Sequence, residues 1–195
     1  MVTNEKIRAF IAIPLRAEVV AGLKIAQETL RDTGITASFP RVSSLHITLK
    51  FLGDITGNQA GAIQQCLDQR ISGFTPFDID VQGLGAFPSV SRPRVAWAGL
   101  EAGDRLLNLQ KLIEKEMKGL GFEPERKKYS PHITLARIKS SRNLDKLRAL
   151  LETMKDFHMG TNQVGSIHLY RSILRPEGAV YQLLAEAKAG RNDRF

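Results

Sequence analysis

The sequence has 195 residues, of which 43% are hydrophobic and 25% charged, and this suits a globular protein with a sizeable core. The single cysteine, Cys66, excludes an internal disulfide and a cysteine-based metal cluster, and no window contains the roughly 18 consecutive apolar residues that span a bilayer. The formal net charge of +8 favours phosphate-rich partners such as RNA, DNA or nucleotides.

Alternating and helical patterns of apolar residues predict five elements in the first part of the chain. They are a strand that ends at a proline, a helix followed by glycine, a second strand, a helix that Thr56 would cap, and a strand with one solvent-exposed face. The predicted ranges are 7–13, 17–33, 45–52, 56–69 and 77–81. A turn-rich connection follows over residues 85–93, and we interpret it as the boundary between two lobes.

The same order of elements returns in the second part of the chain, with a strand, helix, strand, helix and strand. The predicted ranges are 94–100, 104–120, 132–138, 143–154 and 163–170. One more strand is predicted over residues 179–185, after a turn at residues 176–178, and we expect the tail over residues 188–195 to be frayed. The repeated order predicts an internal duplication, with approximate halves 1–88 and 89–195 inside a single bilobal domain.

The tetrapeptide His-Ile-Thr-Leu occurs twice, 86 positions apart, beginning at His46 and at His132. Because side chains alternate between the faces of a strand, His46 would share a face with Thr48, and His132 with Thr134. A pseudo-twofold arrangement of the halves would turn both faces into a central cleft. Arg137 would join that face only if the strand regularity breaks or its long side chain wraps back.

Two facing imidazoles can divide the work of acid and base catalysis, because histidine titrates near neutral pH. In phosphoryl transfer, one group removes a proton from the attacking water or hydroxyl and the other protonates the leaving oxygen. The Thr48 and Thr134 hydroxyls would donate hydrogen bonds to the non-bridging phosphate oxygens. The symmetry of the two copies leaves open which histidine is the acid.

Other interpretations of these residues compete with catalysis. A catalytic zinc ion needs three protein ligands, and no third ligand stands at ligand spacing, so no metal is predicted. His158 and His168 have no repeated context and are interpreted as structural. The basic run 126–128 suits either a solvated loop or the path of a polynucleotide, and Tyr129 suits either a packed loop or stacking on a base.

The chain resembles the two-histidine phosphoesterase superfamily and, within it, the RNA 2',3'-cyclic phosphodiesterase family, also called 2'-5' RNA ligases. Six segments carry the resemblance, namely residues 8–13, 46–53, 93–99, 132–137, 169–172 and 178–181. One departure is Phe39, which stands seven residues before the first histidine, where relatives often carry tryptophan. Both side chains are aromatic, so the departure concerns only the wall of the cleft.

The resemblance implies a bilobal α+β fold with pseudo-twofold symmetry, in which two antiparallel sheets flank a central cleft with helices outside, and no cofactor. It also implies hydrolysis of an RNA-terminal 2',3'-cyclic phosphate to a 2'-phosphomonoester. On this chain His46 would donate a proton to the 3'-oxygen and His132 would accept one from water, with Thr48, Thr134 and Arg137 on the phosphate.

Two alternative functions remain at this point: 2'-5' RNA ligation by the same site, and a non-catalytic module that binds RNA ends. The expected partner is RNA with 2',3'-cyclic phosphate ends or related cyclic nucleotides, and we expect a monomer with no membrane and no protein partner. Residues 1–8 are polar and lack the apolar core of a signal peptide, so we expect a cytoplasmic protein.

Overall fold

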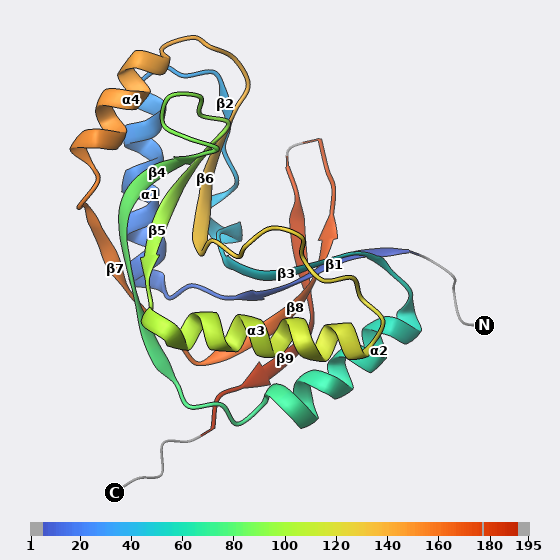
Figure 1. Cartoon of the computed structure of the whole chain (residues 1–195). Helices are drawn as coiled ribbons and strands as arrows, with labels where there is room; N and C mark the ends of the chain where they lie inside the picture. Colours follow the sequence, from blue (N-terminus) through green and yellow to red (C-terminus); the bar gives the residue numbers. More distant parts are fainter. Residues whose placement is uncertain (1–5, 177, 191–195) are drawn as a thin grey trace, which may run out of the picture.

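The computed structural model describes residues 6–176 and 178–190, which form two antiparallel sheets with helices on their outer faces (Figure 1). The strands are β1 (Ile7–Ile13), β2 (Ala37–Ser38), β3 (Ile47–Ile55), β4 (Phe77–Phe87), β5 (Val95–Glu101), β6 (His132–Ile138), β7 (His158–Val164), β8 (Ser166–Ile173) and β9 (Val180–Lys188). The helices are α1 (Ala17–Asp32), α2 (Gly57–Cys66), α3 (Gly103–Gly119) and α4 (Leu144–Thr153), with short helical turns η1 (Val42–Ser44) and η2 (Leu67–Ile71).

The two sheets contain the same three-strand core, built in each case from both parts of the chain. One sheet has the order β3-β1-β8-β9 and the other β2-β6-β5-β4-β7. In one core the motif strand β3 pairs with β1, and in the other the motif strand β6 pairs with β5. The third strand of each core, β8 beside β1 and β4 beside β5, comes from the other part of the chain. The predicted α+β class with two antiparallel sheets is confirmed. The segment over residues 85–93 contains the end of β4 and leads to β5, which is the neighbour of β4 in the same sheet.

The helices bury their apolar faces against the sheets, so the core lies between each sheet and its helices. α1 and α4 cover the sheet that contains β6, and α2 and α3 cover the sheet that contains β3 (Figure 1). The buried residues of α3 recur at helical spacing as the sequence predicts: Leu106, Leu109, Ile113 and Met117. Among residues 6–176 and 178–190, no helix is both long enough and apolar enough to cross a membrane.

The ends of several elements differ from the predictions for local reasons. The predicted cap at Thr56 is present, since its hydroxyl accepts a hydrogen bond from the Gln59 amide at 3.2 Å, but α2 ends at Cys66 and continues as the π-helical turn η2. β3 does not close at Gly53. With a φ of 71°, Gly53 adjoins a bulge opposite β1, and the strand runs on to Ile55.

Two predictions near the carboxyl end are wrong because of pairing that the sequence pattern does not reveal. The strand predicted over 163–170 is divided at Gly165, where β7 ends in one sheet and β8 begins in the other. The predicted frayed tail is paired through Gly190, whose amide donates to the Phe74 carbonyl at 2.9 Å. The predictions for residues 1–5, 177 and 191–195 lie outside the described residues.

Candidate active site

The two motif histidines are held in the same way, although only one lies within a strand. His46 lies between η1 and β3, so the prediction of a strand from Leu45 is wrong, whereas His132 is the first residue of β6. The His46 Nδ1 atom lies 2.8 Å from the Ser44 carbonyl oxygen, and the His132 Nδ1 atom lies 2.8 Å from the Ser130 carbonyl oxygen. Because a carbonyl only accepts hydrogen bonds, each Nδ1 donates, and each Nε2 is left to gain or lose a proton.

A bulge at the same position in both motifs decides which side chains share a face with the histidines. The pairing of β3 with β1 skips Leu49, and the pairing of β6 with β5 skips Leu135. At each bulge two consecutive residues are buried, the leucine and the residue that follows it. The next residue, Phe51 in one copy and Arg137 in the other, is exposed. Arg137 therefore joins the face of Thr134 because the strand regularity breaks, which is one of the two routes the sequence left open.

The charges of the two motifs act on one another in the folded chain. Burial lowers the pKa of His46, the hydrogen bond to the Ser44 carbonyl opposes this, and the positive charge of His132 lowers it further. The pKa of His132 is lowered by burial, raised by the Ser130 carbonyl, and lowered by the Arg137 guanidinium. A chain of charge interactions thus runs from His46 through His132 to Arg137.

We expect both histidines to titrate below their ordinary pKa of 6.5 when the imidazole Cε1 protons are followed by NMR. Since the folded-state pKa values lie below the unfolded value, the unfolded chain binds more protons as the pH falls through about 6.5, and the free energy of unfolding then decreases. A titration midpoint of either histidine at or above 6.5 would contradict this. His158 and His168 are assigned separately by substitution.

Aromatic side chains surround the first histidine. The centroid of the Phe10 ring lies 4.7 Å from that of the His46 ring, and Tyr181 meets the imidazole edge-on at 5.2 Å. A cavity of about 330 Å³ opens beside them and is lined by His46, Tyr170 and Tyr181 together with Arg41 and serines of η1. Sequence reasoning did not assign Phe10, Arg41 or the two tyrosines to the site, although Phe10 and the tyrosines fall in segments of the family resemblance.

The second histidine has its own aromatic wall. Phe87 meets the His132 ring edge-on at 4.9 Å, and Trp97 lies 5.2 Å from Phe87. The Trp97 ring lies directly over Gly85 of the neighbouring strand, where an added Cβ would be 2.2 Å from a ring carbon. The absence of a side chain at Gly85 therefore shapes this wall.

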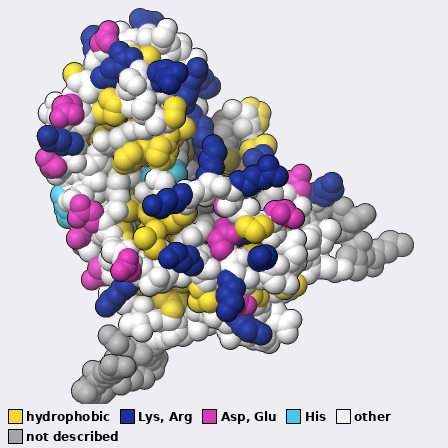
Figure 2. All heavy atoms as spheres, in the orientation of Figure 1, with side chains coloured by type: hydrophobic (Ala, Val, Ile, Leu, Met, Phe, Trp, Pro, Cys, Tyr) yellow, Lys and Arg dark blue, Asp and Glu magenta, His cyan; other side chains and the backbone are white. Residues whose placement is uncertain are grey.

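The remaining predicted residues have different environments. Residues 126–128 are exposed, as either interpretation of the basic run requires. Tyr129 packs against the core and its hydroxyl donates to the Thr48 carbonyl at 2.9 Å, which favours the packed loop over stacking on a base. Lys and Arg side chains gather around a hollow in which hydrophobic atoms and a histidine are visible (Figure 2).

The other two histidines lie outside the pair. His158 is exposed on β7, with Nε2 3.7 Å from an Asp80 carboxylate oxygen. His168 contacts the Tyr170 hydroxyl through Nδ1 at 2.7 Å and Glu186 through Nε2 at 3.3 Å, so it holds a tyrosine of the cavity in place. Within the described ranges 6–176 and 178–190, no group of three or more His, Cys, Asp or Glu side chains could hold a metal ion.

Comparison with known proteins gives consistent relatives. A family model described as the 2'-5' RNA ligase superfamily matches residues 17–173. The RNA 2',3'-cyclic phosphodiesterase of Aeropyrum pernix is 37% identical over 177 residues, covering 90% of this chain and 99% of that protein. The protein of the same name from Methanothermobacter thermautotrophicus is 35% identical over 176 residues, covering 90% of this chain and 95% of the relative.

Solved structures show the same fold over nearly the whole chain. The protein TT0787 of Thermus thermophilus superposes with a TM-score of 0.78 at 28% identity, covering 96% of this chain and 100% of that one. Escherichia coli LigT in complex with 3'-AMP superposes with a TM-score of 0.76 at 21% identity, again over 96% of this chain and 100% of that one.

Proposed function

The chain belongs to the 2'-5' RNA ligase superfamily, and from that premise we propose that it hydrolyses RNA-terminal 2',3'-cyclic phosphates to 2'-phosphomonoesters. The proposed mechanism is general acid and base catalysis between His46 and His132 without a metal ion. The activity is supported by relatives named RNA 2',3'-cyclic phosphodiesterase, which match this chain over most of its length. The mechanism is supported by one observation above all, the identical carbonyl anchoring of both Nδ1 atoms.

The anchoring fixes which atom of each imidazole exchanges a proton. With Nδ1 donating to a backbone carbonyl, a neutral ring has an acceptor at Nε2 and a charged ring has a donor there. The mutual repulsion of two imidazolium ions disfavours the doubly protonated pair, and an anionic phosphate between them favours the presence of one proton. A pair that carries one proton is the state that acid and base catalysis requires.

The assignment of acid and base is supported by a difference in charge on the exposed face of the two motif strands. Arg137 and Phe51 occupy equivalent positions after the two bulges. The Arg137 charge lowers the pKa of His132 and so favours the neutral ring, which can accept a proton from water. His46 would then protonate the 3'-oxygen as it leaves. Thr48 and Thr134 would donate to the non-bridging oxygens and Arg137 would add a positive charge there.

We also propose that the chain is a single bilobal domain that arose by internal duplication, with approximate halves 1–88 and 89–195. The repeated histidine anchor, the repeated bulge and the repeated three-strand core support this proposal. Because the halves exchange their third strands, neither half is a lobe by itself.

The test is turnover of a short RNA that bears a 2',3'-cyclic phosphate, measured with and without EDTA, with the product end identified. We expect equal rates in both buffers and a 2'-phosphate product. Binding of the RNA without turnover would instead favour the end-binding module. Loss of activity in EDTA with recovery on addition of a divalent metal would contradict the metal-independent mechanism. Joining of a 5'-hydroxyl RNA uses the same displacement with another nucleophile, and the high concentration of water favours hydrolysis.

A further inference from the structure

We propose that Lys50, Glu114 and Tyr129 are positioning residues that fix the second histidine motif against the first. The inference rests on the function proposed above. It concerns the segment over residues 120–131, which connects α3 to β6 and is called the connecting loop below. This segment doubles back from the end of α3, past β3, to reach the start of β6 (Figure 1).

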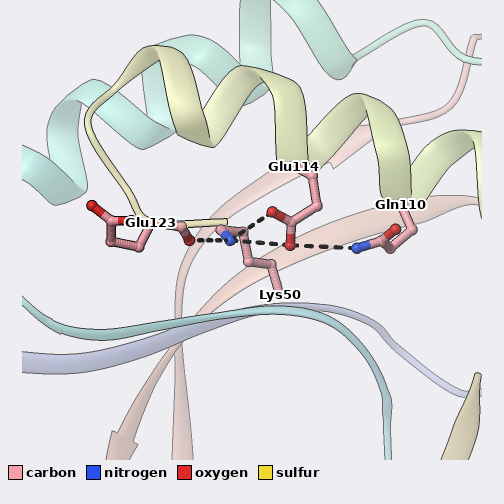
Figure 3. Close-up of polar contacts among 4 residues, drawn as sticks. All are labelled: Lys50, Gln110, Glu114 and Glu123. Carbon is pink, nitrogen blue, oxygen red and sulfur yellow. Dashed lines mark hydrogen bonds and ion pairs between the residues drawn. The ribbon is translucent and has the colours of Figure 1, made fainter. Parts of the chain in front are cut away.

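Lys50 is a buried cation that binds two parts of the chain at once. The bulge at Leu49 turns its side chain to the core side of β3, where only 1% of it is exposed. The ammonium donates to the two Glu114 carboxylate oxygens at 3.0 and 2.9 Å and to the Glu123 carbonyl at 3.0 Å (Figure 3). An ammonium has three donors, so its hydrogen-bonding capacity is fully used. Gln110 donates to one oxygen of the same carboxylate at 3.4 Å.

A second hydrogen bond holds the connecting loop to the same strand. The Tyr129 hydroxyl donates to the Thr48 carbonyl at 2.9 Å. Tyr129 directly precedes Ser130 in the chain, and the Ser130 carbonyl accepts the hydrogen bond from His132. The two residues of β3 that follow His46 at intervals of two, Thr48 and Lys50, therefore hold the loop that ends at His132. The hydrogen bonds of Lys50 and Tyr129 thus join the strand that follows His46 to the loop that precedes His132.

The energetics of a buried ion pair favour a positioning role over a stabilising one. Taking two charges out of water costs about as much as their attraction returns, so a well-packed apolar pair is often equally stable. The second motif supports this view, because its equivalent position after the bulge is the buried apolar residue Ala136. A charge is therefore not required by the motif strand itself. At Lys50 it supplies a directed bond to the Glu123 carbonyl, which an apolar side chain would not make.

The test uses two variants of the full chain that act on the two contacts separately. Lys50→Met with Glu114→Met removes both charges together and keeps unbranched side chains in the core, and Tyr129→Phe removes only the hydroxyl. We expect kcat for the cyclic phosphate RNA to fall about 10-fold in each, because displacement of reacting groups by a fraction of an ångström lowers the rate without removing binding contacts. The KM should change less than about twofold, and the melting temperature of Tyr129→Phe should stay close to that of the parent protein.

An NMR titration gives a readout that does not depend on activity. Burial lowers the pKa of His46 most and the charge of His132 lowers it further, so movement of His132 away from His46 should shift the pKa of His46 upward in both variants. The matched control is Arg70→Met with Glu116→Met, an ion pair between η2 and α3 at 3.9 Å that lies outside the connecting loop. This control should leave kcat and the His46 titration unchanged.

The results distinguish failure of the positioning role from failure of the proposed function. Parent-like kcat and a parent-like His46 titration in Tyr129→Phe and in the folded double variant would overturn the positioning role. If the parent protein itself shows no turnover, the proposed function fails, and the His46 titration still tests the positioning role alone. If the double variant does not fold, Tyr129→Phe decides, since it leaves every charge in place.

Discussion

His46→Ala and His132→Ala are each expected to lower kcat for an RNA 2',3'-cyclic phosphate by about 1,000-fold, since removal of a positioned acid or base loses most of its contribution to the rate. In the proposed mechanism the two imidazoles act on one proton-transfer sequence, with both Nδ1 atoms anchored and each Nε2 left to gain or lose a proton. The double variant should therefore be little slower than either single variant, because residues that act as a unit are not additive. Single-turnover kinetics with a labelled RNA end measure this directly.

The matched control for these variants is His158→Ala, because His158 is an exposed histidine outside the pair whose Nε2 lies beside the surface carboxylate of Asp80. It should retain the parent rate. A His46→Ala or His132→Ala variant with more than about a tenth of the parent kcat would contradict general acid and base catalysis by the pair. If the two single effects multiplied in the double variant, the histidines would act in separate steps.

Thr48→Val and Thr134→Val are expected to lower kcat by about 100-fold each, the usual cost of losing one hydrogen-bond donor to charge that develops in the transition state. Valine keeps the β-branched shape that suits a strand, so the backbone contacts of β3 and β6 should persist. The Thr48 carbonyl, which accepts the Tyr129 hydroxyl, is a backbone group and is unaffected by the substitution.

The control is Thr161→Val on β7, where the threonine hydroxyl donates to Asp80 at 2.6 Å on the exposed surface. We expect this variant to have the parent kcat. A rise in KM with an unchanged kcat in Thr48→Val and Thr134→Val would mean that the hydroxyls bind the ground state as strongly as the transition state. That result would remove their proposed role in stabilising developing charge while leaving a role in binding.

Four of the predicted site residues, the histidine and threonine of each motif, lie in the repeated tetrapeptide, whereas Arg137 is predicted only from the family resemblance. The residues that sequence reasoning missed have no repeat to mark them. His46 and His132 were found because the same tetrapeptide occurs twice, and the serine two residues before each histidine was an unused signal of the common anchor. Phe10, Tyr170 and Tyr181 come from three strands and meet at His46 only in the folded sheet. Periodicity within one strand does not report such neighbours.

Lys50 is a residue whose burial the strand pattern does not predict. A lysine two residues after a threonine in an alternating strand would be expected on the face of the histidine, exposed to solvent. The bulge at Leu49 places it in the core instead, and the cost of burying its charge is offset by Glu114 and the Glu123 carbonyl. Both partners lie far away in the sequence, so local patterns could not reveal this environment.

The sequence by itself determined the local properties of this protein, namely the order of the helices and of the strands other than β2 and the divided pair β7 and β8, the apolar faces of the helices, and the two histidine motifs with their threonines. β1, for example, was predicted over the residues that form it, because alternating apolar residues ending at a proline are a local signal. Only the tertiary structure decided the exchange of β4 and β8 between the sheets, the bulges that direct Arg137 and Lys50, and the contacts across the connecting loop. The physical reason is that strand pairing and burial of charge depend on partners distant in the chain, whereas periodicity reports only which face of an element is apolar.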